Sequence, residues 1–153
     1  MSNTPFGFED PEDSPGFLLW QTTMLWQRQI KKALDDYTLS QAQFVIMATL
    51  MWFEAHHSDT TQILIVQWTK LDKMTVSQSL KKLIDFGYVA RIPHTKDTRA
   101  KSVSLTEKGK EMVNLLVPIV EGIDRDFFNT LEGNDQKNLV KTLGKLLKGL
   151  YEK

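Results

Sequence analysis

Residues 61–106 carry the pattern that most restricts how this chain can fold. Segments 61–69 and 73–86 both have helical apolar spacing, and only a few residues separate them. Asp72 is an N-cap for the second segment, and Thr60 or Thr61 for the first. These residues predict two helices joined by a tight turn. The apolar face expected for the first helix is Ile63, Leu64, Val66 and Trp68.

A two-stranded β-ribbon is predicted to follow the second helix. Gly87 offers a left-handed C-cap, and segments 88–92 and 101–105 read as strands around a turn-rich loop. Polar residues 56–61 could add a short edge strand. The alternation of the returning strand sets the facing of four side chains: inward Val103 and Leu105, outward Ser102 and Ser104.

The order helix, turn, helix, ribbon is that of a winged helix-turn-helix, a shape that puts one helix and one loop into adjacent DNA grooves. Short polar side chains near the start of a helix and long donors further along suit the major groove. Segment 73–86 has both, although a solvated polar face is the alternative. Its inward positions are Val76, Leu80, Leu83 and Ile84. Its candidate DNA contacts are Lys73, Thr75, Ser77, Gln78, Lys81 and Lys82.

The predicted wing loop strengthens the case for DNA. Arg99 lies at its tip, where the negative potential of a minor groove attracts a guanidinium, and Asp97 can orient that group. Lys101 adds a further charge. The formal net charge of the chain is zero, yet residues 70–101 carry a local charge of +5. A weak surface ion pair is the alternative for Asp97 and Arg99, but the helix and the wing together favour DNA binding.

Apolar helices flank this stretch. Ser14 and Pro15 begin one helix, and Ser40 with Gln43 forms a capping box for the next. Further helices are expected over 107–131, with Pro118 inside, and from 135 onward. Their apolar surface exceeds what one small domain buries, which predicts a dimer. The expected organisation is a flexible acidic arm over 1–13 and a single domain over 14–153, with dimerisation helices at 14–37 and 107–153 and a DNA-binding lobe at 40–106.

The wing and the turn after it resemble the MarR-type bacterial transcriptional regulators. That family has a D-x-R-x-x-x-V-x-L-T-x-x-G pattern, matched here by Asp97, Arg99, Val103, Leu105, Thr106 and Gly109. Lys70 and Leu71 stand where a glycine is common, and Val66 replaces a usual alanine. The resemblance covers roughly residues 14–150. It implies a homodimer on a pseudo-palindromic double-stranded operator, most often a repressor, that a small aromatic effector releases.

Other kinds of site are poorly supported. The chain has no cysteine, which excludes disulfides and thiolate metal sites, and His56 and His57 lack metal-ligand spacing. We expect no metal, no cofactor and no enzyme activity. The aromatic candidates for an effector site, with ordinary core packing as the alternative, are Trp20, Trp26, Trp52 and Phe53.

The sequence also predicts where the protein is located and what class of function it has. No apolar run approaches membrane-spanning length and the start is acidic, so a cytoplasmic protein without a membrane partner is expected. The leading hypothesis is a sequence-specific DNA-binding regulator. The alternatives are a winged-helix protein-interaction module that does not bind DNA and, less favoured, a ligand carrier or enzyme.

Overall fold

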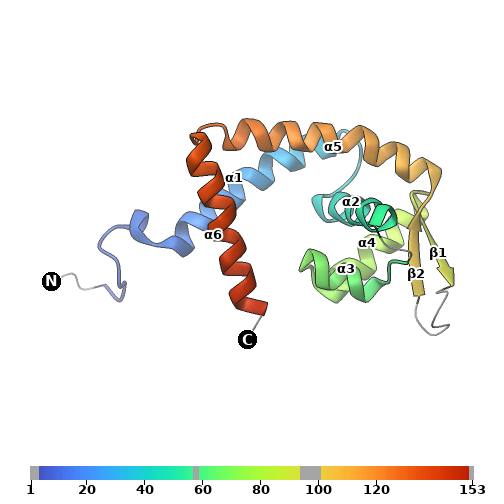
Figure 1. Ribbon diagram of the computed structural model, residues 1–153, viewed down its shortest axis with the longest axis horizontal. Coiled ribbons are helices and arrows are strands. Elements are labelled where there is room, and N and C mark those ends of the chain that lie inside the picture. The colour runs from blue at the N-terminus through green and yellow to red at the C-terminus, as the bar shows by residue number, and fades with distance from the viewer. Residues whose placement is uncertain (1–3, 57–58, 94–100, 152–153) are drawn as a thin grey trace. The chain divides into compact units, whose positions relative to one another are not determined.

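The computed structural model describes residues 4–56, 59–93 and 101–151. Within them the chain forms a mainly α-helical structure with one two-stranded sheet (Figure 1). The elements in order are η1 (Pro11–Asp13), α1 (Pro15–Asp35), α2 (Gln41–His56), α3 (Gln62–Thr69), α4 (Lys73–Asp85), β1 (Val89–Pro93), β2 (Lys101–Leu105), α5 (Glu107–Phe128) and α6 (Gly133–Tyr151). By its internal contacts the chain divides into two compact units, Met1–Val120 and Glu121–Lys153.

Local capping begins the first two α-helices where the sequence predicts. The Ser14 hydroxyl accepts a hydrogen bond from the Phe17 amide at 3.2 Å. Ser40 and Gln43 form the reciprocal capping box, because the Ser40 hydroxyl accepts from the Gln43 amide at 3.1 Å and the Ser40 amide donates to Gln43 Oε1 at 2.9 Å. Both predicted helix starts are confirmed.

The helix-turn-helix is formed by α3 and α4. Thr61 caps α3 by accepting from the Leu64 amide at 3.2 Å. The helix ends at Lys70, whose φ of 64° lies in the left-handed region that favours glycine. Asp72 then caps α4 through the Thr75 amide at 2.7 Å. A tight turn is therefore made without glycine, at a strained lysine.

The core of the first unit is apolar and draws on most of its elements. The predicted inward face of α4 is confirmed, since Val76, Leu80 and Leu83 are fully buried, while Ile84 is half-buried. The largest fully buried side chains are Ile30, Leu34, Ile46, Met47, Leu50, Ile65, Leu80, Leu83 and Leu116.

The apolar face predicted for α3 is only partly right, because Leu64 and Val66 are half-buried. Ile65, which the prediction omits, is fully buried, whereas Ile63 is 67% exposed and Trp68 is 54% exposed. Positions 63–66 are all apolar, so periodicity cannot choose a face. Packing of this short helix against α2, α4 and β2 makes the choice instead.

The β-ribbon forms as predicted, with Val89 opposite Leu105 and Pro93 opposite Lys101. A single bridge between Thr61 and Ser102 provides the expected edge strand. Because this edge covers β2, the prediction that Ser102 faces outward is wrong and its side chain is fully buried. Ser104 is also predicted to face outward, and this prediction is only partly right, because the residue is half-buried.

The flanking helices expose much apolar surface in the single chain. α5 contains Pro118 and ends at Phe128, and α6 begins at Gly133, so both boundaries lie two to three residues from those predicted. Exposed apolar residues of α1 are Phe17, Leu18, Leu19, Trp20 and Leu25. Those of α6 are Val140, Leu143, Leu146, Leu147 and Leu150. The described part of the chain has no helix long and apolar enough to cross a membrane.

Candidate nucleic-acid interface

The second helix of the helix-turn-helix, α4, presents a polar face opposite its buried one. All six candidate DNA contacts predicted for this segment lie on α4, which is thirteen residues long. Five are exposed, namely Lys73, Ser77, Gln78, Lys81 and Lys82, and Thr75 is half-buried. The long hydrogen-bond donors of α4 are therefore exposed, while the buried apolar side of the same helix holds it against the core.

The start of α4 is fixed by Asp72. Its carboxylate accepts from the Thr75 amide at 2.7 Å and from the Thr75 hydroxyl at 2.8 Å. These two hydrogen bonds, the backbone one first, hold the pKa of Asp72 below its ordinary value of 3.8. The Thr75 hydroxyl hydrogen is thus engaged within the protein.

The wing residues are placed only in part. Asp97 and Arg99 lie outside the described residues. Lys101 begins β2, opposite Pro93 at the far end of the ribbon from α5. The base of the wing, in contrast, is well defined.

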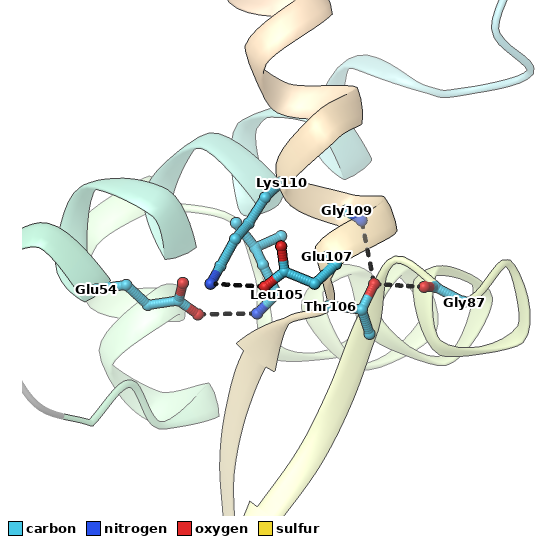
Figure 2. Close-up of polar contacts among 7 residues, drawn as sticks. All are labelled: Glu54, Gly87, Leu105, Thr106, Glu107, Gly109 and Lys110. Carbon is cyan, nitrogen blue, oxygen red and sulfur yellow. Dashed lines mark hydrogen bonds and ion pairs between the residues drawn. The ribbon is translucent and has the colours of Figure 1, made fainter.

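At that base β2 passes into α5 beside the chain that leaves α4 (Figure 2). The Thr106 amide donates to the Tyr88 carbonyl at 3.0 Å, and the Thr106 hydroxyl donates to the Gly87 carbonyl at 2.6 Å. The same hydroxyl accepts from the Gly109 amide at 3.0 Å, so it also caps α5. A Cβ at Gly109 would lie 2.1 Å from the Tyr88 oxygen. The threonine and glycine of the motif therefore serve close packing of α5 on the chain leaving α4.

Sequence reasoning missed two side chains at this base. Glu54, at the end of α2, accepts from the Leu105 amide at 2.8 Å across 51 positions of sequence (Figure 2). Lys108 donates to the Phe86 carbonyl at 2.9 Å and lies over the Tyr88 ring, 4.9 Å from its centroid. Both contacts join segments that are far apart in the chain, so no local sequence pattern predicts them.

The four aromatic candidates differ in exposure and in the ring contacts they make. Trp20 is exposed on α1 and Trp26 is half-buried. Trp52 is exposed and stacks on the His56 ring at 4.1 Å. Phe53 is buried, with the Trp68 ring edge-on at 5.0 Å.

The first unit contains a different cavity, of about 960 Å³. None of the four aromatic candidates lines it. Its polar lining includes Gln27, Arg28, Lys31, Asp35, Gln41 and Lys82. The ammonium group of Lys31 is bonded to Asp35 at 2.8 Å. Since Lys82 belongs to the polar face of α4, the cavity adjoins the candidate DNA-contacting helix.

Comparisons with known proteins agree with this geometry. Residues 35–122 match the family described as ArnR1-like, winged-helix domain. The uncharacterized HTH-type transcriptional regulator YdcH of Bacillus subtilis is 38% identical over 141 residues, which is 92% of this chain and 95% of that protein.

Two solved structures share the fold. One, on regulation of DNA binding of Bordetella bronchiseptica BpsR by 6-hydroxynicotinic acid, has a TM-score of 0.81 at 24% identity and covers 94% of this chain and 97% of that chain. The other is a mutant of Escherichia coli MarR complexed with operator DNA. It has a TM-score of 0.73 at 21% identity, and the match covers 89% of this chain and 92% of that chain.

Proposed function

Because the chain belongs to the ArnR1-like winged-helix family of HTH-type transcriptional regulators, we propose that it represses transcription as an operator-bound homodimer and is released by a small effector. The chain is a MarR-type DNA-binding regulator, which leaves the alternative of a protein-interaction module without support. The observation that carries the proposal is the exposed polar face of α4, held from behind by a fully buried apolar face.

In this proposal α4 enters the major groove. Gln78 is the base reader, because a side-chain amide can make paired hydrogen bonds with adenine. Ser77 and the exposed lysines bind phosphates, which supply salt-dependent affinity without sequence preference. Thr75 contributes its methyl group, since its hydroxyl hydrogen is donated to Asp72.

The wing enters the neighbouring minor groove through Arg99, braced by Asp97, with Lys101 near the phosphates. An arginine is suited to this position because a narrow minor groove concentrates negative potential. The +5 charge of residues 70–101, in a chain of zero net charge, supports the assignment.

Dimerisation is proposed through the exposed apolar side chains of α1 and α6. Each of these helices exposes five large apolar side chains in the single chain, and exposed apolar surface of this extent is uncommon on a monomer. Two recognition helices about 34–36 Å apart would meet successive major grooves of a pseudo-palindromic operator. Sedimentation equilibrium tests this step, and a monomer at micromolar concentration would refute it. The protein acts in the cytoplasm, where genomic DNA is accessible, and the proposal includes no catalytic step.

Release is proposed through an aromatic acid in the cavity of the first unit. The cationic side chains of Arg28 and Lys82 suit an organic anion, and Lys82 is shared with the DNA-contacting face. Regulation of DNA binding of BpsR by 6-hydroxynicotinic acid offers a precedent of this chemical kind. Titrating small aromatic acids, beginning with that compound, into the protein–DNA complex tests the step. If none of these acids releases the DNA, this step of the proposal is refuted.

The decisive experiment measures binding to a duplex selected by the purified protein from a random library. We expect Arg99→Ala to weaken binding and to lower the slope of log affinity against log salt by about 1. Gln78→Ala should cost about 1–3 kcal/mol at one base pair and leave that slope unchanged. Lys32→Ala, which removes an exposed charge from α1, is the control. Unchanged affinity and slope for Arg99→Ala would remove the wing from the interface.

A further inference from the structure

We propose that Glu54 is a positioning residue for the wing. Its carboxylate takes the place of a strand carbonyl at the outer edge of β2 and thereby fixes the direction of the ribbon. This inference rests on the proposed function, because it concerns how the wing is presented to DNA.

The hydrogen-bond pattern of β2 shows why a side-chain acceptor is needed there. Along an antiparallel strand, successive amides point alternately to the two sides. The Val103 amide points away from β1, since it donates to the Thr60 carbonyl at 2.9 Å. The Leu105 amide, two residues later, points the same way, and the Glu54 carboxylate accepts from it at 2.8 Å. Glu54 thus continues the edge that Thr60 begins.

The energetic balance favours this contact. Leu105 is buried, so an unpaired amide at this residue would carry the desolvation cost of a lost hydrogen bond. Glu54 is exposed, so its charge remains hydrated while it accepts. Hydrogen bonds to an ionised acceptor are also stronger than those between neutral groups.

The contact secures the strand from the side opposite Thr106. On the β1 side, the Thr106 amide donates to the Tyr88 carbonyl, and this bond ties α5 to the chain that leaves α4. On the outer side, Glu54 ties the preceding residue to the end of α2 (Figure 2). Without Glu54 the ribbon keeps its β1 pairing but can tilt about that pairing. The wing would then be displaced while α4, which other contacts hold, stays in place.

The test compares Glu54→Ala with Glu54→Gln, which keeps an acceptor oxygen, on the selected duplex. We expect Glu54→Ala to weaken binding roughly five- to tenfold, because the acceptor for the amide of the buried Leu105 is lost, and Glu54→Gln to remain within about twofold of wild type. In an Arg99→Ala background the loss from Glu54→Ala should shrink, since the minor-groove contact of the wing is already gone. In a Gln78→Ala background it should persist in full.

A second measurement reads the contact without DNA. Hydrogen exchange of the Leu105 amide should be slow in wild type and Glu54→Gln and fast in Glu54→Ala, with the urea midpoint of each variant recorded. An undiminished loss in the Arg99→Ala background, an equal loss in Glu54→Gln, or unchanged exchange in Glu54→Ala would each overturn the inference. Failure of the wild-type protein to bind any duplex would instead refute the proposed function.

Discussion

Substitution of Gly109 by alanine tests the packing of α5 on the base of the wing. The added Cβ would lie 2.1 Å from the Tyr88 carbonyl oxygen and 3.2 Å from Leu105 Cδ2. Ordinary contacts are about 3.5 Å. The nearest obstacle is backbone, so α5 or the Tyr88 peptide must move by about 1 Å.

That movement disrupts the bonds of Thr106 to the carbonyls of Gly87 and Tyr88. Each such hydrogen bond contributes about 1 kcal/mol, and an unsatisfied buried group costs more, about 1–3 kcal/mol. Opposing this, alanine is about 1 kcal/mol better than glycine inside a helix. We therefore expect Gly109→Ala to lower the free energy of unfolding by about 2–4 kcal/mol.

Urea unfolding at pH 7, followed by tryptophan fluorescence at one fixed protein concentration, measures this change. Gly122→Ala is the matched control in the same helix, because its Cβ would meet nothing nearer than an Arg125 side-chain nitrogen at 3.8 Å. That variant should gain up to about 1 kcal/mol from helix propensity. If Gly109→Ala proves as stable as Gly122→Ala, the close approach to Tyr88 does not constrain the fold.

Two further predictions concern polar groups. Ser102 has a fully buried hydroxyl without a hydrogen-bond partner among the described residues, so Ser102→Ala should be neutral or stabilise by up to about 1 kcal/mol in urea unfolding; a clear loss would mean that the hydroxyl is bonded. Asp72→Ala should destabilise α4 at pH 7 by removing its cap. Because the pKa of Asp72 is lower in the folded state, this stabilisation exists above pH 3.8 and is lost as pH falls below it. The stability difference between wild type and Asp72→Ala should therefore shrink from pH 7 to pH 3, and a constant difference would contradict the role of the charge.

The starts of the helices could be predicted from the sequence, because each is marked by an N-cap residue. Ser14, Ser40, Thr61, Asp72 and Thr106 each accept a hydrogen bond from an amide three residues later. Such caps need no distant partner, so sequence alone predicts where five helices begin. The winged helix-turn-helix fold and the MarR-type resemblance, which rested on these signals and on the wing motif, are both confirmed.

Burial within uniformly apolar or alternating segments required the tertiary structure. The apolar run 63–66 offers no periodicity, and only packing shows that Ile65 faces the core. Alternation predicts that Ser102 faces solvent, whereas the bridge to Thr61 covers it. In both places the side-chain environment is set by a neighbour that local sequence does not specify.

The order of the elements, their caps and the polar face of α4 follow from the sequence, because these depend on residues within about one helical turn of each other. The attachment of the wing, in contrast, follows only from packing in the folded chain. Glu54 reaches Leu105 across 51 positions, and Gly109 is required by a backbone oxygen of Tyr88 that lies against it. These contacts arise when separate segments pack together, and their free energy depends on distances that exist only in the folded chain.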